Sequence, residues 1–219
     1  MADLDNLAAR VLATARAMNA SGINRGSAGN VSARCGEGAE FLITPTGMAY
    51  EASTSDDMVK VSPGGTVVGP THRARKPSSE WRFHHDIYAA RPEAGAIVHT
   101  HSPFATALAC RSLAVPAFHY MVARFGGVDV RCATYATFGT QALSDAIMAA
   151  LEGRNACLMA HHGMVVFGRD LDQALALAIE LEALCEQYWR VLQLGTPALL
   201  DDAEMARVLE KFAGYGQQD

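Results

Sequence analysis

Hydrophobic and polar positions along the chain follow two periods, one helical and one extended. In residues 1–20, MADLDNLAARVLATARAMNA, apolar side chains recur every three or four positions, which predicts an amphipathic helix. Short apolar runs predict strands in EFLITPTG and GAIVHTH, and a strand pair or a strand with a turn in NACLMAHHGMVVFG. Between them, INRGSAGNVSAR and the segment around VSPGGTVVGP are expected to be loops. The alternation predicts an α/β fold in which helices are layered against a sheet.

Helix boundary signals frame the segment PSSEWRFHHDIYAARP. Ser79 is a candidate N-cap, Glu80 would lie in the first turn, and Pro92 would end the helix. A further helix is expected in TQALSDAIMAAL.

Two more helices are expected from their first and last residues. SPFATALA has Ser102 at the cap position and Pro103 at the first helical position. The longest helix is expected from Asp170 to Leu194, closed by Gly195.

Composition limits the class of protein. The 219 residues are 50% hydrophobic and contain no Pro/Gly/Ser-rich linker, so we expect a single domain over residues 1–219. The net charge is −5 and the 18 Lys and Arg residues are spread along the chain, which argues against nucleic acid as a partner. The N-terminus lacks the pattern of a signal peptide and no apolar run is long enough to span a membrane, so we expect a cytoplasmic protein.

The five cysteines are an odd number and show no C-x-x-C spacing. This pattern predicts reduced residues in the core rather than disulfides.

Two histidines end the apolar run IVHTHS. In an extended chain side chains alternate between faces, so His99 and His101 point the same way and can converge on a metal ion. A third ligand can come from LMAHHGM, where we favour His162 over His161 because Gly163 lets the chain turn beside a crowded site.

Three histidines would leave a fourth tetrahedral position open, as in a catalytic zinc site. The alternative is that these are hydrogen-bonded core histidines without a metal, and the spacing alone does not decide between the two. The other histidines remain as competing ligands: His72, His84, His85 and His119. His84 and His85 would diverge on a helix and make a poor ligand pair.

Metal chemistry also needs a proton acceptor, and Glu80 is the candidate. At a helix start the helix dipole keeps a carboxylate ionised, although Glu80 could do no more than complement that dipole. Three segments nearby, GSAGN, TPTG and KPSSE, bring small residues with free backbone amides or hydroxyls, the components of a phosphate-binding nest.

The blocks GSAGNVSAR, LITPTG, KPSSEWRFH, IVHTHS, HYMVARFGG, YATFGT, HHG and LEKFAGYG occur in an order that closely resembles the class II aldolase/adducin-like superfamily, from about residue 20 to the C-terminus. Within that superfamily the chain is most similar to the bacterial branch that acts on L-fuculose 1-phosphate. The resemblance implies a three-layer α/β/α fold with a mostly antiparallel central sheet, assembled as a homotetramer with active sites between subunits.

The resemblance also assigns residue roles. It implies one Zn²⁺ per subunit held by His99, His101 and His162, and Glu80 as the acid/base that also covers the open metal position in the resting enzyme. The residues matching phosphate-binding positions of the family are Asn30, Thr46, Gly47, Ser78 and Ser79. Tyr120 and Tyr215 match tyrosines that a neighbouring subunit brings toward the aldehyde half of the substrate.

The implied activity is a metal-dependent carbon–carbon lyase that reversibly cleaves a ketose 1-phosphate into dihydroxyacetone phosphate and a short aldehyde such as lactaldehyde. A Schiff-base mechanism is disfavoured because the three lysines, Lys60, Lys76 and Lys211, lie in polar or turn-like sequence. Three alternatives stay open: the same cleavage of 5-deoxyribulose 1-phosphate or 5-methylthioribulose 1-phosphate, a sugar-phosphate 4-epimerase, and a non-catalytic adducin-like interaction domain. The intact histidines and Glu80 argue against the last of these.

Overall fold

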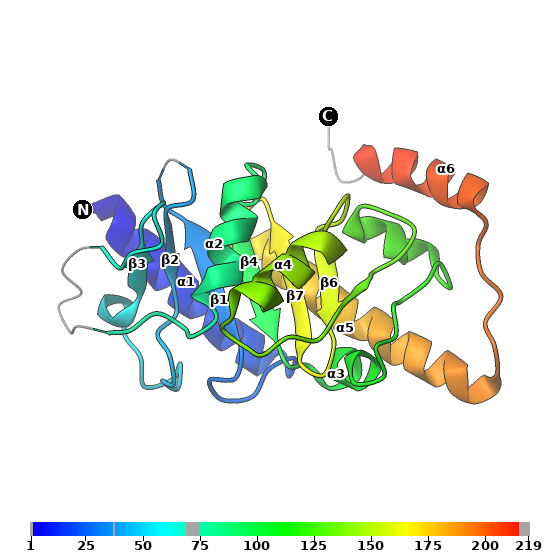
Figure 1. The fold of residues 1–219 in the computed structure, drawn as a ribbon, viewed down its shortest axis with the longest axis horizontal. Helices are drawn as coiled ribbons and strands as arrows, with labels where there is room; N and C mark the ends of the chain where they lie inside the picture. The colour runs from blue at the N-terminus through cyan, green and yellow to red at the C-terminus, as the bar shows by residue number, and fades with distance from the viewer. Residues whose placement is uncertain (1, 37, 69–74, 215–219) are drawn as a thin grey trace.

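A computed structural model describes residues 2–36, 38–68 and 75–214 of the chain. Within these residues, seven strands form one sheet in the order β3-β2-β1-β4-β7-β6-β5 (Figure 1). Every neighbouring pair is antiparallel except β5 and β6, which are parallel. The strands are β1 Asn30–Arg34, β2 Phe41–Ile43, β3 Val59–Val61, β4 Ala96–Thr100, β5 Cys132–Ala133, β6 Ala156–Met159 and β7 Gly163–Gly168.

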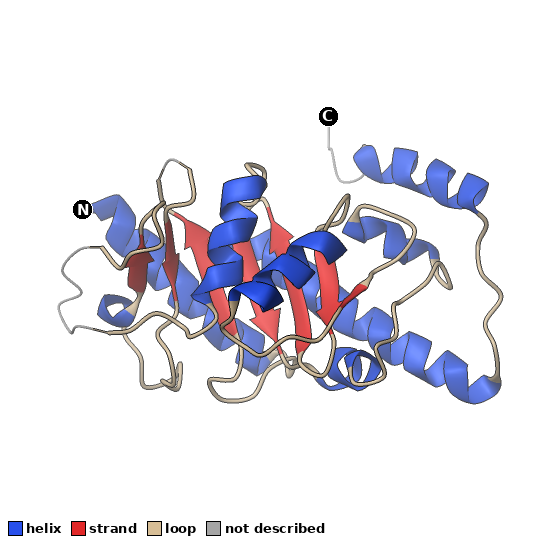
Figure 2. Ribbon diagram, in the orientation of Figure 1, coloured by secondary structure: helices blue, strands red, loops and turns tan. Residues whose placement is uncertain are grey.

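Helices cover both faces of this sheet (Figure 2). The α-helices are α1 Ala2–Ala20, α2 Trp81–Ala90, α3 Pro103–Ala109, α4 Gln141–Ala150, α5 Leu171–Leu194 and α6 Asp202–Ala213, and the 3₁₀ helices are η1 Ser55–Asp57 and η2 Tyr120–Phe125. Helices α2 and α4 lie on one face, and α1, α3 and α5 lie on the other. The three-layer α/β/α architecture with a mostly antiparallel sheet is therefore confirmed.

Two apolar cores follow from the alternation of side chains along the strands. Ile97 packs into the core under α2 and α4, while its neighbour Val98 packs into the core under α1, α3 and α5. Both side chains are fully buried, as expected for a central strand with helices on each side. Because His99 is two residues after Ile97, it points toward the α2 face.

The predicted helices α1, α3, α4 and α5 are confirmed. Helix α3 has Ser102 at its N-cap and Pro103 at its first position, and α5 runs from its N-cap at Asp170 to its C-cap at Gly195. The strand pair predicted in NACLMAHHGMVVFG is the antiparallel hairpin of β6 and β7.

The predicted start of α2 is wrong by one residue. Glu80, not Ser79, is the N-cap, and its side chain makes no capping hydrogen bond. The carboxylate turns instead toward the histidines at the end of β4, 3.1 Å from His99. The expected loop INRGSAGNVSAR is also wrong in its second half, which forms β1. Strands β3 and β5 and helix α6 were not predicted.

The cysteine prediction is partly confirmed. All five cysteines are free, and Cys157 and Cys185 are buried. Cys110, at the end of α3, is exposed, so the core prediction is wrong for this residue.

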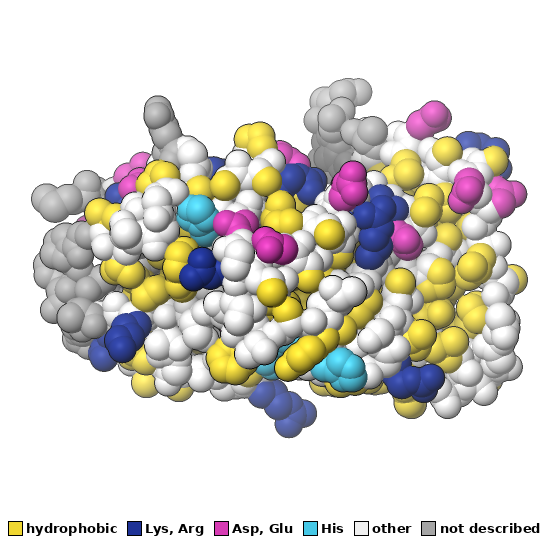
Figure 3. Space-filling model, viewed as in Figure 1, with side chains coloured by type: hydrophobic (Ala, Val, Ile, Leu, Met, Phe, Trp, Pro, Cys, Tyr) yellow, Lys and Arg dark blue, Asp and Glu magenta, His cyan; other side chains and the backbone are white. Residues whose placement is uncertain are grey.

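Charges are mixed on one face of the molecule (Figure 3), as the spread of charged residues along the sequence predicts. On the face shown in Figure 3, Lys and Arg side chains are dispersed among Asp and Glu.

In the part of the chain that the structure describes, no helix has the length and apolar character needed to cross a membrane.

Candidate metal centre and active site

The register of the sheet brings the end of β4 and the starts of β1 and β7 together at one end of the strands. Strand β4 ends there, and its His99 pairs with Asn30, the first residue of β1. On the other side of β4, Thr100 pairs with Met164 near the start of β7. Glu80, at the N-terminal end of α2, lies at the same end of these strands. Residues that lie far apart in the sequence therefore meet at the carboxyl end of β4.

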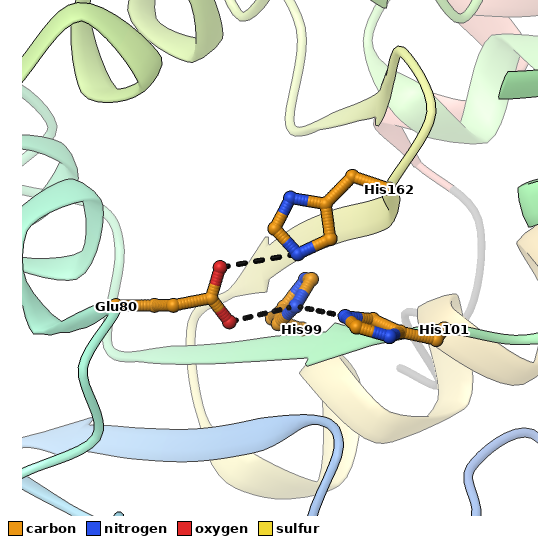
Figure 4. Close-up of side chains that lie close together, drawn as sticks. All are labelled: Glu80, His99, His101 and His162. Carbon is orange, nitrogen blue, oxygen red and sulfur yellow. Dashed lines mark hydrogen bonds and ion pairs between the residues drawn. The ribbon is translucent and has the colours of Figure 1, made fainter. Parts of the chain in front are cut away.

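Glu80, His99, His101 and His162 form a compact cluster there (Figure 4). One donor atom from each lies within 4.8 Å of all the others. The two oxygens of Glu80 are each 3.1 Å from an imidazole nitrogen, Oε2 from His99 Nε2 and Oε1 from His162 Nε2. The Nε2 atoms of His99 and His101 are also 3.1 Å apart. The side chains converge on one point from a strand, a loop, a turn and a helix N-cap.

The turn between β6 and β7 separates the two adjacent histidines. His161 has a left-handed backbone, with φ of 56°, and its exposed side chain packs edge-on against Tyr135. His162 points into the cluster. Gly163 is required next to it because a Cβ at this position would lie 2.4 Å from the carbonyl oxygen of Thr100. The sequence argument favoured His162 because Gly163 lets the chain turn there, and in the structure this turn separates His162 from His161.

Hydrogen bonding fixes which nitrogen of His99 faces Glu80. Its Nδ1 donates to the carbonyl oxygen of Met164 at 2.9 Å, so in the neutral ring Nε2 presents a lone pair to the carboxylate. At 3.1 Å, Glu80 Oε2 and His99 Nε2 need a cation between them, either a proton on Nε2 or a metal ion; burial opposes the proton, but the Glu80 carboxylate outweighs burial and raises the pKa of His99. Glu80 Oε1 is buried, and among the described residues its partner is His162 Nε2 at 3.1 Å. A site of three imidazoles and one carboxylate fits a divalent metal such as zinc.

Electrostatics keep Glu80 ionised. Burial alone would raise its pKa, but the charges and close contacts of His99 and His162 outweigh burial and hold the pKa well below its usual range. Burial and the neighbouring charges of His99 and His162 lower the pKa of His101 to about 4. His101 is therefore a neutral imidazole at pH 7, the form that binds metals.

A cavity of about 350 Å³ opens onto the cluster. Its lining residues are Ala28, Ser79, Glu80, His101, Tyr135, Ala136, Phe138, His161 and His162. This volume suits a small organic substrate. A larger cavity of about 770 Å³ lies between η2 and α6 and contains none of the cluster residues. We assign the candidate site to the smaller cavity because three of the candidate metal ligands, Glu80, His101 and His162, line it.

The residues expected at a phosphate site lie in adjacent segments. Asn30 is buried and donates from Nδ2 to Ser78 Oγ at 3.0 Å and to Glu80 Oε2 at 3.2 Å. Ser79 is exposed in the cavity wall. Thr46 and Gly47 are exposed in the loop after β2, which pairs with the segment before α2. The structure thus brings Asn30, Ser78 and Ser79 beside Glu80, with Thr46 and Gly47 on the neighbouring loop.

The two expected tyrosines are not part of this cavity. Tyr120 is half exposed in η2, where its ring stacks on Phe212 of α6, and it lines the larger cavity. Tyr215 lies outside the described residues.

The other histidines considered as ligands lie elsewhere. His84 lies on the buried side of α2, His85 contacts the carbonyl oxygen of Pro63, and His119 caps η2. His72 lies outside the described residues.

Sequence reasoning missed several residues near the site. His84 and Tyr88 face β1 from α2 and contact Ser32, and all three are buried. Their spacing of four on a helix was the available signal. The cavity residues Tyr135 and Phe138 lie within the quoted block YATFGT but had no assigned role.

Comparisons with known proteins identify the family. The profile of the family described as "Class II Aldolase and Adducin N-terminal domain" matches residues 9–189. The chain is 55% identical over 202 residues to a 5-methylthioribulose-1-phosphate/5-deoxyribulose-1-phosphate aldolase of Rhodospirillum rubrum, covering 92% of this chain and 89% of that protein. It is 43% identical over 213 residues to the L-fuculose phosphate aldolase of Escherichia coli, covering 97% and 96%.

A solved structure agrees with these sequences. An L-fuculose 1-phosphate aldolase superposes with a TM-score of 0.90 at 35% identity, over 95% of this chain and 96% of that one. The resemblance inferred from the sequence blocks is confirmed by all three comparisons. The metal-binding cluster accords with them, because class II aldolases are metal-dependent lyases. The chain belongs to the class II aldolase and adducin family and is a class II aldolase.

Proposed function

We propose that the chain is a zinc-dependent aldolase that reversibly cleaves a ketose 1-phosphate into dihydroxyacetone phosphate and a short aldehyde. The observation that carries this proposal is the cluster of Glu80 with three imidazoles, all within 4.8 Å, at the wall of a cavity of substrate size. His99, His101 and His162 would hold one Zn²⁺ per subunit. The chemistry supplied by such an ion is Lewis-acid stabilisation of the negative charge that develops on the ketone fragment.

Glu80 is the proposed acid/base. Its carboxylate is ionised, buried and turned into the site rather than onto the helix amides, which suits a group that accepts the hydroxyl proton of the substrate and later returns a proton. It also occupies the side of the cluster that the three histidines leave open.

Asn30 and Ser78 support the proposed phosphate site. Ser78 Oγ accepts hydrogen bonds from Asn30 Nδ2 and, at 3.3 Å, from the backbone N–H of Glu80. Since both bonds use its lone pairs, the hydroxyl proton is left to donate elsewhere, as an anionic group would require. Ser79, Thr46 and Gly47 would complete the site from the two paired loops.

Two substrate classes have comparable support. The sequence resemblance put L-fuculose 1-phosphate first, and a relative of that name is 43% identical. A relative named for 5-methylthioribulose 1-phosphate and 5-deoxyribulose 1-phosphate is 55% identical, so cleavage of these pentose derivatives is supported equally well. The products would then be a methylthio-aldehyde or acetaldehyde in place of lactaldehyde.

Assembly is part of the proposal. Tyr120 is half exposed and lies away from the cavity of its own chain. We place it, together with Tyr215, at the active site of a neighbouring subunit in a cytoplasmic homotetramer, with residues 1–219 of each chain as one domain.

One experiment tests the proposed function directly. Purified enzyme is incubated with L-fuculose 1-phosphate, 5-deoxyribulose 1-phosphate and 5-methylthioribulose 1-phosphate, and dihydroxyacetone phosphate is measured through a coupled dehydrogenase. We expect release from at least one of them, dependent on bound zinc. Epimerised sugar without free dihydroxyacetone phosphate would identify a 4-epimerase, and no turnover of any of them would favour an adducin-like interaction domain.

A further inference from the structure

A buried chain of hydrogen bonds leads from Glu80 away from the cavity into the contact between β1 and α2. Asn30 donates to Glu80 Oε2 at 3.2 Å, and its Oδ1 is 2.5 Å from His84 Nε2. On the other side of the ring, His84 Nδ1 is 2.7 Å from Ser32 Oγ. Ser32 Oγ is in turn 2.8 Å from the hydroxyl of Tyr88. The four residues beyond Glu80 are each at most 2% exposed: Asn30, His84, Ser32 and Tyr88.

The charge on Glu80 sets the direction of every bond in this chain. A carboxylate only accepts hydrogen bonds, so Asn30 must present its amide nitrogen to Glu80 and its carbonyl oxygen to His84. The carbonyl oxygen also only accepts, so His84 must carry its proton on Nε2. Its Nδ1 is then an acceptor.

The remaining two bonds follow from that tautomer. Ser32 donates to His84 Nδ1, and Tyr88 donates to Ser32. Burial is the main cause that lowers the pKa of His84 to about 3, so the ring stays neutral and keeps one donor and one acceptor. All donors therefore point from Tyr88 toward Glu80.

The same amide fixes a second group. The Nδ2 atom of Asn30 also donates to Ser78 Oγ at 3.0 Å. If the amide rotated, Glu80 would lose a donor and Ser78 would lose the bond that leaves its hydroxyl proton free. Inside the described residues, His84 is the side chain that contacts Oδ1 of this amide.

We infer that His84 is a positioning residue of this aldolase: through its Nε2–H it holds the Asn30 amide in the one orientation that serves both the Glu80 carboxylate and the Ser78 hydroxyl. The inference rests on the proposed function in that Glu80 and Ser78 act on the substrate. His84 itself touches neither the cavity nor the metal-binding cluster, so it acts through Asn30.

Amide variants separate this role from simple filling of the core. In His84→Gln the side-chain amide can reach the position of Nε2 and still donate to Asn30, whereas in His84→Asn the shorter amide reaches only the position of Nδ1. We expect kcat to fall by about 10- to 100-fold in His84→Asn and by clearly less in His84→Gln, with zinc content unchanged in both. His85→Gln, on the same helix, is the control and should keep wild-type kcat.

A double-mutant cycle tests whether His84 acts through Asn30. In an Asn30→Ala background, His84→Asn should lower kcat by less than about 2-fold, because the amide to be oriented is gone. Independent, multiplicative losses would contradict the inference, as would equal losses in His84→Gln and His84→Asn.

The tautomer is measured without turnover. The ¹⁵N NMR spectrum of the zinc-loaded protein should show His84 protonated at Nε2 and unprotonated at Nδ1, without titration between about pH 5 and pH 8. A proton on Nδ1 would overturn the inference. If the protein cleaves none of the ketose phosphates, the proposed function fails, while this spectrum still decides the orientation of the chain.

Discussion

His99 contacts the backbone through one ring nitrogen and the side-chain cluster through the other. Its Nδ1–H is held by the carbonyl oxygen of Met164, and its Nε2 faces Glu80 and His101. The ring orientation is therefore set by the backbone of β7 before any ion is bound. Such preorganisation is typical of metal-binding histidines.

Removing single ligands tests the metal centre at this scale. His99→Ala, His101→Ala or His162→Ala should each leave a folded protein with little bound zinc and almost no activity, because two imidazoles do not hold the ion tightly. His161→Asn is the control, since His161 points away from the cluster, and should keep most of its zinc. Elemental analysis of the purified variants measures this, and normal zinc content in His162→Ala would exclude His162 as a ligand.

A second residue-scale prediction concerns Glu80. Glu80→Gln keeps the volume but loses the charge and the basicity. We expect kcat to fall by about 10²- to 10⁴-fold with zinc still bound. Exchange of the methylene proton of dihydroxyacetone phosphate with deuterated water needs the metal and the base but no aldehyde, and it should be lost. Exchange at the wild-type rate would mean that another group is the base.

The sequence was informative about the residues of the cluster and silent about their support. His99 and His101 stand out because two histidines end an apolar run. For His84 the sequence offers only its spacing of four from Tyr88 on a helix, because its partners Asn30 and Ser32 are close to it only after β1 pairs with β4 and α2 packs on top. A contact between distant segments cannot be seen in local spacing.

At the scale of elements, α5 holds α3 in place through one buried side chain. Glu182 of α5 accepts hydrogen bonds from Ser102 Oγ at 2.7 Å and from the backbone N–H groups of Phe104 and Ala105 at 2.8 and 2.9 Å. It thus satisfies free amides at the start of α3. The segment it fixes comes directly after His101, so this contact also steadies the loop that carries this proposed metal ligand.

Glu182→Ala should therefore lower both stability and zinc affinity. The loss of charge-assisted hydrogen bonds at a helix start should cost at least about 2 kcal/mol in the free energy of unfolding. Glu180 lies on the same helix as Glu182 and forms a partly exposed ion pair with Arg124 of η2. Glu180→Ala is therefore the control and should lower the free energy of unfolding by less than about 1 kcal/mol. Urea titration and competition with a zinc chelator measure the two effects. Similar results for both variants would contradict a special role for Glu182.

The tight turn before β7 gives another element-scale prediction. A Cβ on Gly163 would lie 2.4 Å from the backbone of Thr100, so Gly163→Ala should displace β7 or the end of β4 and weaken zinc binding by about 10-fold or more. Gly64→Ala, where the added Cβ would be 3.8 Å from the nearest heavy atom, is the control and should bind zinc normally. Isothermal titration with Zn²⁺ compares the two; normal affinity in Gly163→Ala would show that the close contact is relieved without cost.

Elements with strong periodicity or clear caps were predictable, and the others were not. Helix α5 has Asp170 and Gly195 at its ends and a long apolar face. Strand β1 has the sequence NVSAR, with Asn30 and Ser32 on the face that meets α2. Because these two residues are polar, the segment resembles a loop in sequence, and the strand was not predicted. They are tolerated in the interior because side chains of α2 complete their hydrogen bonds.

For the whole molecule, the proposed homotetramer makes a prediction that a monomer could not satisfy. If Tyr120 serves the active site of a neighbouring subunit, Tyr120→Ala and Glu80→Gln should each be nearly inactive alone, and in a mixed assembly the two defects can lie in different chains. Mixed, unfolded together and refolded, the two inactive variants should recover about a quarter of wild-type activity, because random assembly pairs two intact half-sites with about that frequency. Activity that stays at the level of the parents would place Tyr120 outside a shared site. Light scattering on the wild-type protein checks the tetramer itself.

The central position of β4 has a consequence for how the chain acquires its metal. His99 and Met164 are 65 residues apart in the chain, and the ladders on both sides of β4 join distant segments. Such non-local pairing has a high loop-closure cost and forms slowly during folding. Three histidines that are brought together by these ladders do not exist as a group in the nascent chain. The proposed ligand group is complete only when the middle of the sheet has closed, so a newly synthesised chain could bind an ion there only from that point on.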